Sequence, residues 1–210
     1  MLTKLKICGI TNIDDVLMCA GLGVDWLGFN FFPESPRYIA PEDARQIIDQ
    51  LPQGVESIGI LVKPTLEQAK TIIEKTHIKR VQIYGPQDFD NMEILEIPVI
   101  ISYRISEDAN LSLEFLGAEM ILLDSYSKDT MGGTGESFNW ALIPPYISRQ
   151  KLVLAGGIRP ENIRDALHIV KPAVIDVASG SESEPGKKDP EKVARLMKEI
   201  NRFNEKQKDT

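Results

Sequence analysis

The sequence predicts a single (β/α)8 barrel that spans residues 1–210, and three observations support this fold class. Eight short apolar segments rich in β-branched residues recur along the chain. Stretches with helical periodicity follow them, as in α/β proteins with parallel strands. Polar or glycine residues lie at the ends of several different strands, and a barrel gathers those ends in one ring. An open doubly wound sheet is the alternative, but eight units can close without edge strands.

The expected strands are short and mostly apolar, so they fit a sheet that helices cover on its outer face. They cover Lys4–Cys8, Asp25–Phe29, Glu56–Leu61, Lys79–Ile83, Pro98–Ser102, Glu119–Leu123, Lys151–Leu154 and Ala173–Val177. The clearest helices open at or near proline, which favours a first helical turn. These helices cover Pro41–Gln50, Thr65–Lys75, Pro160–Val170 and Pro190–Phe203. The charged tail, Asn204–Thr210, is expected to fray.

The composition excludes several classes of protein. Asp and Glu number 31 against 24 Lys and Arg, which disfavours a nucleic-acid binder because such a protein needs a basic face. No apolar run reaches the roughly 18 residues of a membrane span. The two Cys are too few for a disulfide framework, and no apolar leader opens the chain, so we expect a cytoplasmic protein. An acidic protein can still bind a phosphorylated small molecule through local backbone dipoles.

Glycine-rich segments end the seventh and eighth expected strands. Gly156 and Gly157 follow the seventh strand, and Ser179 and Gly180 follow the eighth. Tight turns would explain either segment alone, but the pair on consecutive strands favours the phosphate site of phosphate-binding barrels. A third run, Gly132–Gly135, is expected to be a mobile loop or a flank of that site, where the hydroxyl of Thr134 could donate a hydrogen bond.

Three side chains at or after strand ends are candidate functional groups. Cys8 lies at the catalytic end of the first strand, although a buried Cys is more often a small hydrophobic residue, the role that we assign to Cys19. Asp124 ends the sixth strand and is either a helix N-cap or a catalytic carboxylate. Arg37 is either a solvated surface residue or a two-pronged donor for a substrate carboxylate.

Strand alternation predicts one buried ion pair. Lys6 lies on the same face of its strand as Cys8, and that face points into the barrel. The first and eighth strands become neighbours when the barrel closes. A buried ammonium needs a partner, and Asp176 is the nearest acidic residue by this argument.

Six strings, in this order along the chain, resemble the phosphoribosylanthranilate isomerase family. They are KICGIT (6–11), SPRYI (35–39), LLDS (122–125), GGTGESFNW (132–140), LAGGIRPENI (154–163) and ASGSESEPGKKD (178–189). The resemblance implies a (β/α)8 barrel with no cofactor and no metal. It implies an Amadori rearrangement of N-(5-phosphoribosyl)anthranilate to 1-(2-carboxyphenylamino)-1-deoxyribulose 5-phosphate in tryptophan biosynthesis. We expect a monomer or homodimer with a phosphorylated small-molecule substrate and no nucleic-acid or membrane partner.

The resemblance also assigns roles to matching residues. It implies that Asp124 is the general acid, Cys8 the general base and Arg37 the contact for the anthranilate end. Backbone amides in both glycine-rich segments would hold the phosphate, and they belong to Gly156, Gly157, Ser179 and Gly180. The acid must be protonated when it reacts, which calls for a raised pKa. A free thiol is only a few per cent thiolate near neutrality, so Cys8 needs a cation or dipole nearby.

Two segments depart from the family pattern. Gln82–Gly85 reads Gln-Ile-Tyr-Gly where the family usually has Gln-Leu-His-Gly, and Leu61–Lys63 replaces a Phe-Val-Asn-like string. Both lie near the expected barrel mouth and affect substrate affinity more than reaction type. A non-catalytic barrel that binds a phosphorylated metabolite is therefore one alternative. The related histidine-pathway sugar isomerase is another, although that enzyme has a carboxylate where this chain has Cys8 and needs two phosphate sites.

Overall fold

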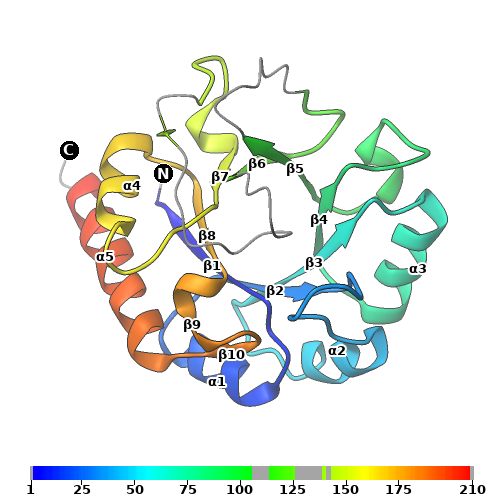
Figure 1. Ribbon diagram of the computed structural model, residues 1–210, viewed down its shortest axis with the longest axis horizontal. Helices are drawn as coiled ribbons and strands as arrows, with labels where there is room; N and C mark the ends of the chain where they lie inside the picture. Colours follow the sequence, from blue (N-terminus) through cyan, green and yellow to red (C-terminus); the bar gives the residue numbers. More distant parts are fainter. Residues whose placement is uncertain (1, 106–113, 126–138, 141–142, 209–210) are drawn as a thin grey trace.

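Eight parallel strands close into a barrel in simple chain order (Figure 1). The computed structural model describes residues 2–105, 114–125, 139–140 and 143–208. The strands are β1 Lys4–Cys8, β2 Trp26–Asn30, β3 Glu56–Val62, β4 Arg80–Tyr84, β5 Val99–Ile105, β6 Met120–Ser125, β7 Leu152–Leu154 and β8 Val174–Val177. The predicted fold class is therefore confirmed. Among the strands, the largest boundary error is at β5, which continues past Ser102 to Ile105.

Five α-helices in the described part of the chain pack on the outside of the barrel (Figure 1). They are α1 Ile13–Gly21, α2 Pro41–Ile48, α3 Leu66–Thr76, α4 Ile163–Val170 and α5 Pro190–Lys208. Asn12 caps α1 by accepting a hydrogen bond from the Asp15 amide, and Thr65 and Gln68 form a capping box on α3. Proline occupies the first turn of α2, as predicted.

Two helix predictions are wrong at their ends. Helix α4 begins at Ile163 instead of Pro160, because Asn162 Oδ1 accepts a hydrogen bond from the Arg159 amide and holds the preceding residues in a turn. Helix α5 does not fray after Phe203 but continues to Lys208. The Asn204 side chain exchanges two hydrogen bonds with the backbone of Thr3, which anchors the last turns to the start of the barrel.

The expected strand–helix alternation is interrupted after β4. A single 3-10 turn, η1 Met92–Leu95, replaces an α-helix there, and the left-handed Glu96 ends it. Asn91 caps this turn by accepting a hydrogen bond from the Glu93 amide, and the proline at position 98 follows soon after, which leaves little length for a helix. Gly132–Gly135 and Thr134 lie outside the described residues, as do the segments 106–113 and 126–138 that follow β5 and β6.

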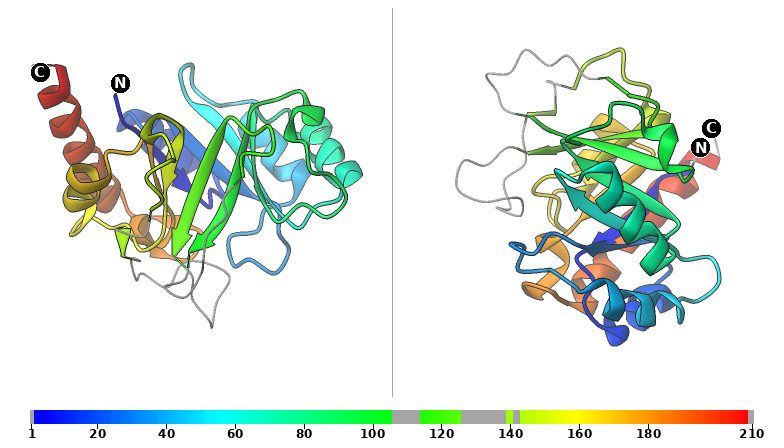
Figure 2. Two further views of the ribbon diagram at one scale, coloured as in Figure 1. Left: turned by 90° about the horizontal axis from the view of Figure 1, so that it is seen from above. Right: turned by 90° about the vertical axis from the view of Figure 1, so that its right-hand side faces the viewer.

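A small hairpin extends the end of β8. The 3-10 turn η4 Ser179–Ser181 leads into β9 Glu182–Glu184, which pairs with β10 Lys187–Lys188 before α5 begins. Figure 2 shows this orange hairpin at the end of the barrel toward which the green strand arrows point. The hairpin therefore lies beside the carboxyl ends of the strands, where a barrel places its functional groups.

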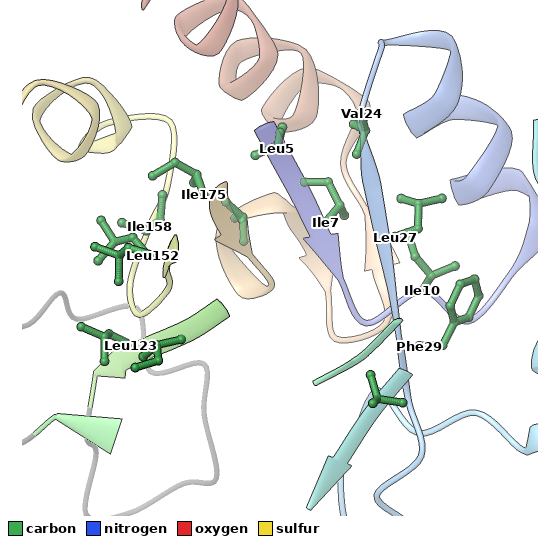
Figure 3. Packing of buried hydrophobic residues seen from close by; sticks show 14 of the residues in the cluster. Leu5, Ile7, Ile10, Val24, Leu27, Phe29, Leu123, Leu152, Ile158 and Ile175 are labelled. Atoms are coloured by element: carbon green, nitrogen blue, oxygen red, sulfur yellow. The ribbon is translucent and has the colours of Figure 1, made fainter. Parts of the chain in front are cut away.

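Apolar residues form two layers on the two faces of the barrel wall. Leu5, Ile7 and Leu27 point outward and pack beneath the helices (Figure 3). A second cluster that includes Trp26, Ile58 and Leu122 is built from strand residues of the opposite parity. The parity that sends Leu5 and Ile7 outward sends Lys6 and Cys8 inward. Within the described ranges, no helix is both long and apolar enough to cross a membrane.

Candidate active site

A pocket at the carboxyl ends of the strands brings the candidate residues together. It contains six of the seven site residues expected from the sequence, and the seventh, Gly180, lies directly behind it against Ile158. Every strand of the barrel contributes to the pocket through its carboxyl end or the loop that follows it. The lining residues are Cys8, Asn30, Phe32, Ser35, Arg37, Ile60, Val62, Gln82, Tyr84, Arg104, Asp124, Ala155, Gly156, Gly157, Ile158, Asp176, Ala178 and Ser179.

Cys8 shares the floor of this pocket with a buried ion pair. The Lys6 ammonium is fully buried and lies 2.9 Å from both carboxylate oxygens of Asp176, which confirms the predicted pair. Burial raises the pKa of the Cys8 thiol and the charge of Asp176 adds to this, while the positive charges of Lys6 and Lys188 act to lower it. The two cations thus favour the thiolate, although they do not fully offset burial and the charge of Asp176, and the pKa of Cys8 stays above its ordinary value.

Asp124 lies across the pocket beside Tyr84. The Tyr84 hydroxyl donates to Oδ2 of Asp124 at 3.4 Å, and Nε2 of Gln82 donates to the same hydroxyl at 3.2 Å. Burial, and then the negative charge of Asp124, raise the pKa of Tyr84 well above its ordinary value. Tyr84 therefore remains a neutral phenol that can keep Asp124 oriented.

Arg37 reaches the pocket, but its two-pronged donor is occupied. Nε and Nη2 of Arg37 donate to the Glu182 carboxylate at 2.7–3.1 Å, and the Glu182 side chain is only 4% exposed. Lys188 donates to the same carboxylate at 2.7 Å and also to the carbonyl of Cys8. The glycine at position 9 permits this packing, because a Cβ there would lie 2.5 Å from Cδ of Arg37. Arg37 is thus neither a solvated residue nor a free two-pronged donor.

The two glycine-rich segments contact each other as the phosphate hypothesis requires. Gly156 and Gly157 both have positive φ, 85° and 62°, and within the described ranges no oxygen accepts a hydrogen bond from their amides. Consecutive amides of this kind form a concave anion-binding surface. Asn162 fixes this loop by donating to the Gly157 carbonyl at 2.9 Å. A Cβ on Gly180 would lie 2.0 Å from the Ile158 carbonyl oxygen, so the two loops pack directly together.

Sequence reasoning missed three charged residues of the site. Glu182 and Lys188 stand in a polar run that carries no apolar signal of burial, yet the β9–β10 hairpin buries both. Arg104 was missed because the fifth strand was expected to end at Ser102. The alternation of apolar residues through Ile105 is the signal that could have extended that strand and placed Arg104 at the barrel mouth.

The pocket also contains an acceptor with no protein partner. Oε1 of Gln82 is buried and accepts no hydrogen bond from any residue that the structure describes. A hydroxyl of a bound sugar could donate to it. No group of three or more His, Cys, Asp or Glu side chains in the described ranges is arranged to hold a metal ion.

Comparisons with known proteins agree with this geometry. The family profile described as N-(5'phosphoribosyl)anthranilate (PRA) isomerase matches residues 5–199. The chain is 39% identical over 203 residues to N-(5'-phosphoribosyl)anthranilate isomerase of Citrifermentans bemidjiense, with 96% of this chain and 98% of that protein covered. It is 38% identical over 201 residues to the enzyme of that name from Thermotoga maritima, with 94% and 98% covered.

Solved structures give the same result. The phosphoribosyl anthranilate isomerase of Thermus thermophilus has a TM-score of 0.85 at 32% identity, with 96% of this chain and all of that chain covered. A phosphoribosyl anthranilate isomerase in complex with reduced 1-(o-carboxyphenylamino)-1-deoxyribulose 5-phosphate has a TM-score of 0.79 at 36% identity, with 95% and 99% covered. The profile match and these relatives show that the chain belongs to the N-(5'-phosphoribosyl)anthranilate isomerase family.

Proposed function

We propose that this protein converts N-(5'-phosphoribosyl)anthranilate to 1-(2-carboxyphenylamino)-1-deoxyribulose 5-phosphate in tryptophan biosynthesis. The observation that carries this proposal is the placement of Cys8 and Asp124 in one pocket with the two phosphate-type loops. An acid, a base and an anion site around one cavity are the parts that this aldose–ketose isomerisation needs.

Asp124 acts as the general acid in the first step. It donates a proton to the furanose ring oxygen of the substrate, the ring C–O bond breaks, and the nitrogen lone pair forms an iminium ion at C1′. The Tyr84 hydroxyl contacts Oδ2 of Asp124 and holds the carboxyl group toward the pocket. The acid must carry its proton at the start of this step, since only the neutral carboxyl can donate.

Cys8 acts as the general base in the second step. The positive iminium ion acidifies the C2′ proton, and the Cys8 thiolate removes it to give an enolamine, which then tautomerises to the ketone. Lys6, which Asp176 holds beneath the sulfur, favours the thiolate through its charge. The active enzyme therefore has a deprotonated thiol together with a protonated Asp124, which is a minor ionisation state at neutral pH.

The two ends of the substrate bind at different parts of the pocket. Its phosphate accepts hydrogen bonds from backbone amides of Gly156, Gly157, Ser179 and Gly180, and the unpaired amides of the two left-handed glycines support this assignment. Arg37 contacts the carboxylate at the anthranilate end. Its Nη1 remains available, because the hydrogen bonds to Glu182 use only Nε and Nη2.

Rescue of a tryptophan auxotroph that lacks this step, together with conversion of the purified substrate, tests the proposal. Rescue and measurable turnover support it. Tight phosphate binding without turnover would support a non-catalytic binding barrel instead. Rescue of a histidine auxotroph alone would indicate the related sugar isomerase. The structure favours the tryptophan enzyme, because the pocket has a thiol rather than a carboxylate at the end of β1.

We further propose a cytoplasmic protein that is a monomer or a homodimer. Both cysteines are free, which suits a reducing compartment. A related enzyme from Thermotoga maritima is described as dimeric. Sedimentation at several protein concentrations would distinguish a monomer from a dimer.

A further inference from the structure

Arg104 has a defined place in the pocket that the proposed mechanism does not use. It lies near the end of β5 in direct register with Asp124 on β6, and its side chain lines the pocket. Its guanidinium carbon lies 5.7 Å from the centroid of the Tyr84 ring, within cation–π range. Tyr84 in turn contacts Asp124, so the guanidinium, the phenol and the acid form one connected group.

The strand order places Arg104 at the end of the pocket opposite the phosphate loops. Those loops follow β7 and β8, and in a closed ring of eight strands the positions opposite them are β3 and β4. Arg37 lies in the loop after β2 and Arg104 lies on β5, on the two sides of this opposite position, but the Arg37 guanidinium turns toward Glu182 in the hairpin after β8. A ligand whose phosphate occupies the glycine-rich loops extends its other end between these two arginines.

The two arginines differ in what already compensates their charge. Glu182 accepts two-pronged hydrogen bonds from Arg37 and neutralises it locally. Arg104 rests on an aromatic face, and no carboxylate or carbonyl in the described ranges accepts a hydrogen bond from it. A guanidinium on a ring keeps its planar set of N–H donors free for a carboxylate. Arg104 is therefore better prepared than Arg37 for a two-pronged contact.

We propose that Arg104 is a second residue that binds the carboxylate of the aromatic substrate end and selects for it, with Tyr84 as the platform that orients its guanidinium. This inference rests on the proposed function, since it takes the substrate from that reaction. It adds a specificity element, because a ligand that lacks the carboxylate leaves the Arg104 donors without that partner in the occupied pocket. Tyr84 then has two contacts, one to the acid and one to the arginine.

The test compares two ligands that differ only in the carboxylate. One is the reduced product analogue with the 2-carboxyphenylamino group, and the other is its phenylamino counterpart. Arg104→Gln should raise Kd for the carboxylate analogue by about 10- to 100-fold, the range for a charge-assisted hydrogen-bonded contact, and should change Kd for the phenylamino analogue by less than about 3-fold. Arg104→Lys should restore part of the affinity, because it keeps the charge but loses the planar fork.

Three variants separate this role from general charge or folding effects. Lys75→Gln removes an exposed cation near the end of α3 that does not line the pocket, and it should not alter Kd for either ligand. Tyr84→Phe keeps the ring and should preserve the discrimination between the ligands, whereas Tyr84→Leu should reduce it. Thermal unfolding of each variant shows whether it is folded at the assay temperature.

The outcomes distinguish this inference from the proposed function. The inference is overturned if Arg104→Gln loses affinity equally for both ligands, or loses no affinity for the carboxylate analogue. This holds even if the wild-type protein turns over its substrate. A carboxylate-specific loss supports it. If the wild-type protein binds the analogue in an Arg104-dependent manner but shows no turnover, only the proposed activity fails.

Discussion

The Lys6 ammonium lies 2.9 Å from both oxygens of the Asp176 carboxylate, in direct register between β1 and β8 and on the face of β1 that Cys8 shares. Lys6 is completely buried and Asp176 is 7% exposed. Desolvation lowers the pKa of Lys6, but the charges of Asp176 and Cys8 and their hydrogen bonds together outweigh it, so that the net shift is upward and Lys6 stays charged. The Lys6 ammonium therefore lowers the pKa of the Cys8 thiol, while the negative charge of Asp176 opposes part of this effect.

Replacing Lys6 should make the Cys8 thiol less acidic. In Lys6→Met the pKa of Cys8 rises, because burial remains and one of the two opposing cations is lost. Iodoacetamide alkylation of Cys8, followed by peptide mass spectrometry, should then need a higher pH than in the wild-type protein. Lys4→Met, at an exposed position two residues earlier, is the control and should not shift the profile. An unchanged profile in Lys6→Met would show that Lys6 does not act on the thiol.

Cys19 provides an internal comparison in the same experiment. Burial raises the pKa of its thiol to about 12. Cys19 should therefore remain unmodified over the pH range in which Cys8 reacts. Equal alkylation of both cysteines would indicate that the protein had unfolded rather than that Cys8 is activated.

Arg37→Ala should impair substrate binding more than turnover. The contact between Arg37 and the anthranilate end persists from the bound substrate to the transition state, so KM should rise by about 10-fold with a much smaller change in kcat. Steady-state kinetics measures both constants. An unchanged KM would contradict the role of Arg37 and would leave Arg104 as the carboxylate contact in the pocket.

Glu182 should contribute stability that depends on pH. Burial raises its pKa, but hydrogen bonds from Arg37 and the charge of Lys188 outweigh burial, so the pKa of Glu182 lies below its ordinary value. Because this pKa is lower in the folded than in the unfolded protein, the ionised carboxylate stabilises the fold at pH values above the unfolded-state pKa of about 4.3. This stabilisation is lost as the pH falls through the lower folded-state pKa. The stabilisation should therefore be present at neutral pH and disappear in acid.

Glu182→Gln is expected to lower the free energy of unfolding at pH 7 by about 3 kcal/mol, because it leaves two cations without their carboxylate. Urea unfolding at neutral and acid pH measures the difference from the wild-type protein, which should shrink in acid. Glu184→Gln in the same hairpin is the control, since its carboxylate is 68% exposed and should have little effect at either pH. A constant difference at all pH values would argue against the charge pair.

Gly180→Ala should damage the phosphate site. The new Cβ would lie 2.0 Å from the Ile158 carbonyl oxygen and 3.0 Å from Cα of Arg159, and backbone cannot move aside as a flexible side chain does. We expect a loss of stability of about 1–3 kcal/mol and a higher Kd for inorganic phosphate. Gly21→Ala at the end of α1 is the matched control, because no atom lies within 4 Å of its Cβ position. Similar phosphate affinity in Gly180→Ala and the wild-type protein would contradict the assignment.

The barrel could be predicted from sequence because strand periodicity and chain order determine it. The same parity argument predicted the Lys6–Asp176 pair, since it needs only alternation along β1 and the closure of β1 against β8. Helix ends were less predictable. The turn at Arg159–Asn162 and the anchoring of Asn204 to Thr3 depend on side-chain hydrogen bonds that no periodic pattern indicates.

The polar residues that complete the site were harder to predict for a different reason. Glu182 and Lys188 are buried only because a two-stranded hairpin places them against Arg37 and the carbonyl of Cys8. Charged residues in a polar run normally indicate exposure, so burial through long-range pairing reverses the usual inference. The contact between Arg37 and Glu182 also occupies the Arg37 donors. It joins two residues that lie far apart along the chain, so the sequence alone does not indicate it.

The central claim is that Asp124 and Cys8 are the acid and base of one isomerisation. Measuring kcat in variants that each lack one of these groups tests this claim most directly. Asp124→Asn keeps the shape of the side chain but cannot donate the proton, and Cys8→Ala removes the base. Each change should lower kcat by about 10²–10⁴-fold while leaving Kd for the reduced product analogue nearly unchanged. If either variant kept turnover within about 10-fold of the wild-type value, that residue would not be the proton-transfer group and the account would be wrong.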